Sequence, residues 1–144
     1  MRRYGERIVA GARYRARPGV YAILLRGADI LVTFQADPEP EIQLPGGGID
    51  KGEQPLAALR REVCEETGWS IAAPRRLGAY RRFAYMPEYD MWAEKIAHVY
   101  LARPVQRLSA PTEPNHAAFF LPAVLAVERI ASAGERAFLR RLIG

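Results

Sequence analysis

The sequence predicts an α/β fold in which one β-sheet is flanked by helices. Three observations support this fold class. Apolar runs of strand length come first, a glycine-rich loop leading into an amphipathic helix follows, and further strands and two short helices end the chain. The chain has 144 residues, of which 49% are hydrophobic, and this is enough for one core. We therefore expect a single domain over residues 1–144.

The first expected element is a β-hairpin. Residues 20–25 and 30–34 are rich in strand formers, and residues 26–29 between them contain a glycine and indicate a tight turn. Pro18-Gly19 is expected to interrupt any structure that precedes it. No helix or strand is therefore predicted for the arginine-rich stretch 1–18.

The strongest helix signal covers residues 55–67. Pro55 suits the first turn, and Gly68 suits the left-handed position that follows the last turn. An apolar stripe is expected from Leu56, Leu59 and Val63, which recur at helical spacing and should pack on the sheet.

The other expected elements follow from turn residues and strand formers. They are a loop at 37–40, strands at 41–44, 77–85 and 96–102, a connection at 86–92, a polar loop at 103–117, a strand at 119–121, and helices at 122–130 and 133–142.

Charge and cysteine content narrow the class of protein. The net charge is +5 and the pI is about 9.7, which favours an anionic partner such as a phosphorylated small molecule or nucleic acid. The basic residues are 19 arginines and 2 lysines. Cys64 is the only cysteine, so an internal disulfide and a thiolate zinc site are excluded. Without a secretory signal or a membrane-spanning stretch, we expect a soluble cytoplasmic protein.

Three carboxylates share one face of the predicted helix. Glu62, Glu65 and Glu66 have the spacing i, i+3 and i+4, so their charges lie close together. A hard divalent cation such as Mg²⁺ is a common compensation for such repulsion, although a solvated acidic face is the ordinary alternative. The preceding glycines, Gly46, Gly47 and Gly48, let the backbone approach a ligand closely.

This region resembles the signature of the Nudix hydrolases. The matching positions are Gly47, Glu53, Arg61, Glu62, Val63, Glu65, Glu66, Gly68 and Trp69. With about one chance in 15 for each of the seven fixed residue types, a random match is on the order of 10⁻⁸ per start point. Trp69 departs from the pattern, which usually has an aliphatic residue there. The resemblance implies an α/β/α sandwich with a mixed central sheet.

The resemblance also implies an activity, namely hydrolysis of a nucleoside diphosphate derivative by attack of water at phosphorus. Mg²⁺, with Mn²⁺ as the alternative, would screen the pyrophosphate and polarise its oxygens. The implied ligands are the carboxylates of Glu62, Glu65 and Glu66 and the carbonyl of Gly46. Arg61 is expected to orient a glutamate, with Glu53 as the favoured partner.

Several residues compete for the role of general base. Glu62 and Glu65 lie on the helix, whereas Glu113 lies in the later polar loop, where some relatives place an extra carboxylate. His116 is a further alternative. His98, within a predicted strand, is expected to be a packed histidine.

The nucleoside end of a substrate should rest on aromatic and cationic side chains. Candidates for substrate binding are Gly47, Gly48, Arg81, Arg82, Tyr85, Tyr89 and Trp92. Because neighbours on a strand point to opposite faces, at most one of Arg81 and Arg82 is expected to contact phosphate.

The substrate and the assembly stay open at this stage. A nucleoside triphosphate, including an oxidised one, or a dinucleoside polyphosphate is favoured over ADP-ribose, and nucleic acid is expected only as a capped or triphosphate RNA end. A non-hydrolytic module that binds nucleotide or RNA is the rival from another class. The chain is expected to be a monomer or a homodimer.

Overall fold

The computed structural model describes residues 1–112 and 115–144. Eight strands form a curled mixed sheet with the order β1-β6-β7-β2-β3-β4, while β5 pairs with β2 and β8 pairs with β3. The strands are β1 (Arg2–Gly5), β2 (Tyr14–Arg26), β3 (Asp29–Gln35), β4 (Glu41–Gln43), β5 (Gly46–Gly48), β6 (Trp69–Met86), β7 (Met91–Arg107) and β8 (His116–Pro122). The helices are α1 (Pro55–Thr67), α2 (Ala123–Arg129) and α3 (Ala133–Ile143), and a short 3₁₀ turn covers Pro87–Tyr89.

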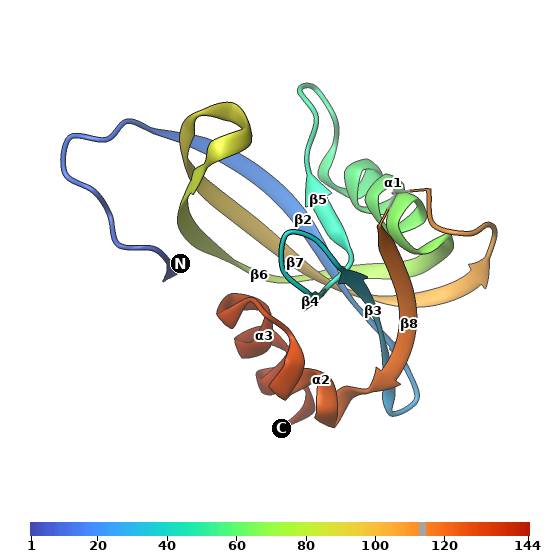
Figure 1. Ribbon diagram of the computed structural model, residues 1–144. Helices are drawn as coiled ribbons and strands as arrows, with labels where there is room; N and C mark the ends of the chain where they lie inside the picture. The colour runs from blue at the N-terminus through green and yellow to red at the C-terminus, as the bar shows by residue number, and fades with distance from the viewer. Residues whose placement is uncertain (113–114) are drawn as a thin grey trace.

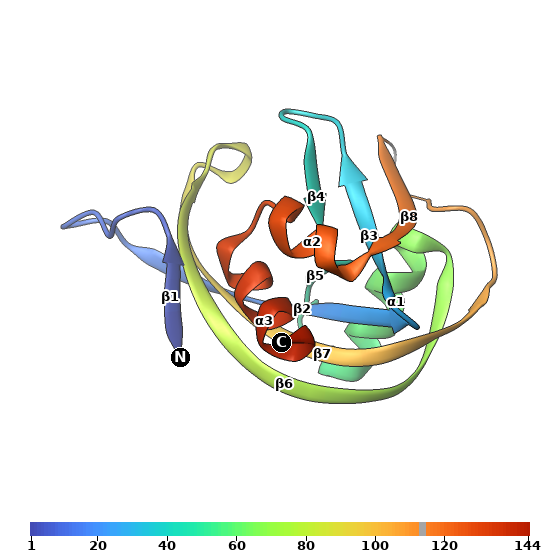
Figure 2. The ribbon, with the colours of Figure 1, turned by 90° about the horizontal axis from the view of Figure 1, so that it is seen from below.

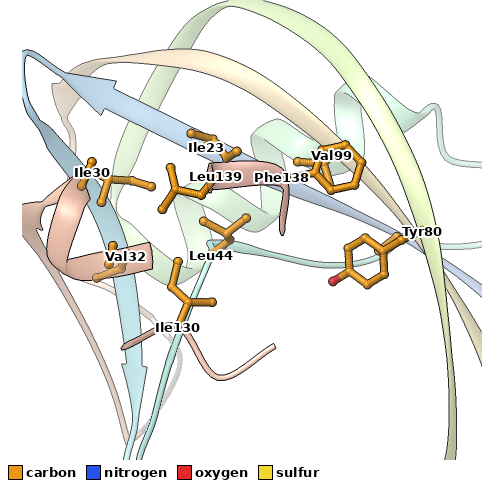
Figure 3. Packing of buried hydrophobic residues seen from close by; sticks show 12 residues of the cluster. Ile23, Ile30, Val32, Leu44, Tyr80, Val99, Ile130, Phe138 and Leu139 are labelled. Atoms are coloured by element: carbon orange, nitrogen blue, oxygen red, sulfur yellow. The ribbon is translucent and has the colours of Figure 1, made fainter. Parts of the chain in front are cut away.

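Helices cover both faces of the central strands, as the predicted fold class requires. Helix α1 lies on one side and helices α2 and α3 lie on the other (Figure 1), and Figure 2 shows α2 and α3 in front of the sheet from below. Each side has its own apolar cluster. The α1 side buries Val20, Leu24 and Leu59, and the opposite side buries the cluster drawn in Figure 3, which includes Ile23 and Leu139.

Strand β2 is the central strand of this arrangement. It pairs in parallel with β7 from Tyr14 to Leu24, pairs with β5 at Gly19–Tyr21, and contacts β3 only beside the hairpin turn. Alternate residues therefore enter the two cores, with Val20 on the α1 side and Ile23 on the other. The Gly46–Gly48 loop is thereby fixed at the middle of the sheet.

The prediction that Pro18-Gly19 interrupts the chain is wrong, because β2 runs through both residues back to Tyr14. The Pro18 carbonyl accepts a hydrogen bond from Ile49 N on the β5 side, so the nitrogen of Pro18, which carries no hydrogen, also faces that side. Residues 14–17 have only β7 as a strand neighbour. Proline is tolerated here because its nitrogen faces away from β7, at the end of the short β5 pairing, so the long β2–β7 ladder loses no donor.

Other boundaries also differ from expectation. Strands β6 and β7 are far longer than predicted, and β7 continues to Arg107, so the expected polar loop is shorter at both ends. The predicted apolar stripe on α1 is wrong at Leu56, which is 43% exposed, whereas Leu59 and Val63 are buried as expected. In the described residues no helix combines the length and the apolar character needed to cross a bilayer.

Candidate active site

Helix α1 is fixed at both ends by local features of the sequence. Pro55 occupies its first turn, and Gly68 has a φ of 79° while its N–H donates to the carbonyl of Cys64 at 2.8 Å. A Cβ atom at Gly68 would lie 1.8 Å from the Ser109 carbonyl oxygen, so only glycine fits. Leu59 and Val63 pack into the sheet, and this orients the adjacent acidic face.

The glycine loop lies directly against that acidic face. A Cβ atom at Gly47 would come within 2.5 Å of the Glu62 carboxylate, and one at Gly46 would lie 2.2 Å from the Val20 carbonyl oxygen. The Gly46 N–H donates to Glu66 Oε1 at 2.7 Å. The absence of side chains at Gly46 and Gly47 therefore lets strand β5 contact two of the three carboxylates.

Arg61 is at the centre of the charged network. Its Nε donates to Glu53 Oε2 at 2.8 Å and its Nη2 donates to Glu53 Oε1 at 2.9 Å, which makes a bidentate pair. Its Nη1 lies 3.0 Å from Glu62 Oε1 and 3.3 Å from Glu65 Oε2. Its Nη2 also donates to the Gly48 carbonyl at 3.1 Å. One guanidinium thus connects the glycine loop with three glutamates, Glu53, Glu62 and Glu65.

The electrostatics of the Arg61–Glu53 pair are strongly mutual. Hydrogen bonds from the Arg61 side chain, and then from the Asp50 backbone, lower the pKa of Glu53 to about 2. The same contact raises the pKa of Arg61 further above its usual range. Both groups therefore stay ionised at neutral pH, and Glu53 holds Arg61 in one orientation.

The three carboxylates differ in exposure. Glu66 is buried, with a relative exposure of 8%, whereas Glu65 reaches solvent. Nδ1 of His116 lies 3.7 Å from Glu66 Oε2. His116, an alternative for the general base, is therefore beside the acidic face, whereas Glu113 lies outside the described residues.

The chemistry of these donors fits a hard divalent cation. In residues 1–112 and 115–144 no three His, Cys, Asp or Glu side chains are already arranged as a ligand cluster. The carboxylates of Glu62 and Glu65 nevertheless share a face, and Arg61 brings positive charge within 3.3 Å of both. A site whose ligands are all carboxylate and carbonyl oxygens suits Mg²⁺ or Mn²⁺ better than zinc.

A cavity of about 480 Å³ lies on the α2–α3 side of the sheet, next to the glycine loop. Tyr21 connects the two regions, since it lines the cavity and its ring lies against Gly46. Burial, followed by the charges of Glu135, Glu66 and Glu62, raises the pKa of Tyr21 well above its usual value. The tyrosine is therefore a neutral hydroxyl between the carboxylates and the cavity.

Charged residues of the cavity include two that the sequence did not single out, Lys95 and Glu135. Glu135 Oε1 accepts a hydrogen bond from Leu44 N at 2.6 Å, and burial raises the pKa of this carboxyl to about 7. In the sequence, Ser132 and Glu135 have the spacing of a helix capping box, which gives no hint of a cavity. Lys95 carries no local signal either.

The predicted substrate residues separate in space. Arg82 lines the cavity, whereas Arg81 lies 4.0 Å from Glu94 and does not line it, in agreement with strand alternation. Tyr85 and Trp92 pack on each other with ring centroids 5.0 Å apart, outside the cavity lining.

The remaining predicted aromatic residue, Tyr89, is exposed at the tip of the β6–β7 hairpin. His98 is half-buried and contacts Arg76, which is consistent with a packed histidine. Trp69 packs edge-on against Phe120 with centroids 5.5 Å apart, so its departure from the signature serves packing.

Comparison with known proteins identifies the family. The profile of the NUDIX domain matches residues 15–142, which include the glycine loop, α1 and the cavity. The chain belongs to the Nudix hydrolase family.

Solved Nudix structures share the fold. The NUDIX hydrolase from Nitrosomonas europaea superposes with a TM-score of 0.71 over 89% of this chain and 90% of that one, at 14% identity. The MutT NUDIX hydrolase from Burkholderia pseudomallei gives 0.65 over 88% and 97%, at 23% identity.

Sequence relatives within the Nudix family match over shorter segments. A Bacillus subtilis protein named as a candidate 8-oxo-dGTP diphosphatase is 31% identical over 74 residues, which are 51% of this chain and 50% of that protein. An RNA pyrophosphohydrolase from Helicobacter pylori is 42% identical over 57 residues, 36% of this chain and 37% of that protein. The matched segments thus span half or less of these relatives.

Proposed function

We propose that the protein hydrolyses the pyrophosphate linkage of a nucleoside diphosphate derivative by direct attack of water at phosphorus. The observation that carries the proposal is the acidic face of α1, which lies against the glycine loop and is organised by the Arg61–Glu53 pair. Relatives named for a nucleoside triphosphate and for RNA ends support a nucleotide-derived substrate.

A divalent metal ion fits this site. Glu62, Glu65 and Glu66, with the carbonyl of Gly46, would hold Mg²⁺ or Mn²⁺, which when bound screens the pyrophosphate charge and polarises its oxygens. Arg61 holds Glu62 and Glu65 on one side of the loop, so that their orientation is set before the substrate binds.

The cavity beside the carboxylates fits the nucleoside part of the substrate. Its volume of about 480 Å³ is in the range of small-molecule sites, and its lining combines Tyr21 and Tyr80 with the charged groups of Arg82 and Glu135. Aromatic rings accept any base, and the polar groups select among bases by hydrogen bonds.

A screen of nucleotide derivatives in ¹⁸O-labelled water tests the proposal. Nucleoside triphosphates, 8-oxo nucleotides, dinucleoside polyphosphates, ADP-ribose and 5′-triphosphorylated RNA are incubated with Mg²⁺ or Mn²⁺, and products are identified by mass spectrometry. We expect ¹⁸O in a phosphate or monophosphate product, and loss of turnover with a chelator. Tight nucleotide binding without cleavage under every condition would instead establish a non-hydrolytic binding module.

A further inference from the structure

The positive charge of the chain is concentrated in residues 1–17, here called the arm. Six of the 21 basic residues and one of the 16 acidic residues lie in the arm, so it carries the whole net charge of +5 and the rest of the chain balances at 15 of each sign. The basic residues are Arg2, Arg3, Arg7, Arg13, Arg15 and Arg17, and all six are exposed.

Within residues 1–112 and 115–144, no carboxylate forms an ion pair with these arginines, since none of the six has a carboxylate oxygen within 4.0 Å. The only acid of the arm, Glu6, accepts a hydrogen bond from Tyr85 N on the neighbouring strand. A surface of this kind attracts polyanions, because several arginines together can replace the cations that are condensed on a chain of phosphates.

The arm adjoins the candidate active site. Arg17 lines a small cavity of about 140 Å³ together with Gly48 of the glycine loop and Lys95. In the sheet register Lys95 lies between Arg17 and Arg82, so three cations form one row across β2, β7 and β6. Burial, and then the charges of Arg82 and Arg17, lowers the pKa of Lys95, in keeping with this crowding.

The cations continue away from the site along β2. Arg15 and Arg17 occupy the same face because strand residues alternate, and Arg13 precedes the strand directly. At about 3.3 Å per residue, the path from Gly19 to Arg13 covers roughly 20 Å. Along this stretch β2 lies beside β7, and in Figure 1 the turn that precedes β2 extends away from the rest of the chain.

An exposed aromatic ring accompanies the path. Tyr89 is 59% exposed, and the guanidinium of Arg17 lies 5.2 Å from the centre of its ring. Sites for single-stranded nucleic acid typically combine a positively charged groove with exposed aromatic rings. The bases stack on the rings, and the phosphates contact the arginines.

We propose that the arm binds a single-stranded RNA whose 5′ polyphosphate end occupies the active site. This inference rests on the proposed function, and it names the substrate class of the same site. The path starts beside the glycine loop and not on an isolated face, which favours a chain held at its end over an anionic lipid surface. The exposed Ile8 and Val9 at the turn of the arm make an anionic membrane the alternative to be tested.

The test compares a double variant, Arg13→Ala with Arg15→Ala, with a control that loses the same charge elsewhere, Arg103→Ala with Arg129→Ala. Binding of a fluorescent 5′-triphosphorylated single-stranded RNA is followed by anisotropy at several salt concentrations. Each lost phosphate contact lowers the salt slope by about 0.7, so we expect a decrease of about 1.4 and about tenfold weaker binding in the arm variant. The control should keep both quantities near those of the wild type.

Hydrolysis separates this inference from the proposed function. In the arm variant kcat/KM for the RNA should fall at least about fivefold more than kcat/KM for GTP. Equal losses in the arm and control variants, equal losses for RNA and GTP, or binding of phosphatidylglycerol vesicles that RNA does not compete away would overturn the inference. Because anisotropy needs no turnover, RNA binding through the arm is measured even if the wild type hydrolyses neither substrate, which would refute only the proposed function.

Discussion

At the scale of single residues, the chain separates an ion pair that stays charged at neutral pH from a carboxyl whose pKa burial raises. The Arg61–Glu53 pair is bidentate and partly exposed, whereas Glu135 is buried beside the cavity. Strand alternation predicted from sequence that Arg81 and Arg82 diverge, and they do. Alternation could not reveal Glu135, because its burial depends on the packing of α3 over a loop far away in the sequence.

Glu135 should make stability depend on pH. Burial raises its pKa from 4.5 to about 7, despite the Leu44 N–H and the charges of Arg82 and Arg136, with Glu41 acting in the same sense as burial. The folded state therefore binds the extra proton, and this stabilisation is complete below pH 4.5 and is lost as the pH rises through 7. In Glu135→Gln we expect that part of the pH dependence of the unfolding free energy, on the order of 2–3 kcal/mol, to disappear.

Chemical denaturation of wild type and Glu135→Gln between pH 4.5 and 8 measures this effect. Glu128→Gln on α2 is the matched control, since Glu128 is exposed. Parallel pH curves for wild type and Glu135→Gln would contradict the assignment.

The bidentate contact of Arg61 with Glu53 gives a second prediction at the residue scale. Arg61→Lys keeps the charge but cannot make two parallel hydrogen bonds to Glu53. We expect kcat to fall about 10–100-fold and the apparent Kd for Mn²⁺ to rise, because Glu62 and Glu65 lose their fixed orientation. Mn²⁺ titration by electron paramagnetic resonance separates this positioning role from a purely structural one, which would leave the Kd unchanged.

At the scale of elements, the bounds of α1 were predicted because its signals are local: a proline at its start, a glycine after its end, and the apolar residues Leu59 and Val63 between them. The sheet was predicted less well. Pro18-Gly19 is taken as an interruption unless it is known that β2 has an open side there. Strands β6 and β7 continue into segments with proline and arginine, residues 74–76 and 103–107, which give no strand signal. Local sequence cannot show which strand edge is open.

The end of α1 gives a stability prediction. Gly68→Ala places a Cβ atom at 1.8 Å from the Ser109 carbonyl oxygen, in a backbone with a φ of 79°. Gly11→Ala has a similar φ of 83° with nothing within 4 Å, so it isolates the cost of the conformation. We expect about 1 kcal/mol of destabilisation for Gly11→Ala and about 2–4 kcal/mol for Gly68→Ala. Equal urea midpoints would show that the clash is relieved at no cost.

A substitution in the glycine loop should lower activity while leaving stability nearly unchanged. In Gly47→Ala the Cβ atom meets the end of the Glu62 side chain at 2.5 Å, which is cheap to move but displaces a carboxylate of the site. We expect kcat to fall about 10–100-fold with little change in Tm. Gly48→Ala, where nothing lies within 4 Å, should lose less activity, and a larger loss there than in Gly47→Ala would refute the argument.

At the scale of the whole molecule, the two faces of the sheet carry different parts of the candidate site. Helix α1 and its carboxylates lie on one face, the cavity lies on the other, and Tyr21 on β2 joins them beside the glycine loop. The acidic face was readable from a contiguous signature in the sequence. The cavity was not, because its lining comes from β2, β3, β4, β6, β7 and α3, which are brought together by strand pairings such as the parallel β2–β7 ladder and by the packing of α3.

The most direct test of the central claim is the turnover of Glu65→Gln against Glu128→Gln, measured with Mg²⁺ on the best substrate of the screen. Glu65 reaches solvent, so its neutral isostere should leave Tm unchanged while kcat falls about 10²–10³-fold, and Glu128→Gln should stay within about twofold of the wild type. Unchanged turnover in a folded Glu65→Gln protein would show that the acidic face of α1 is not the site of the reaction.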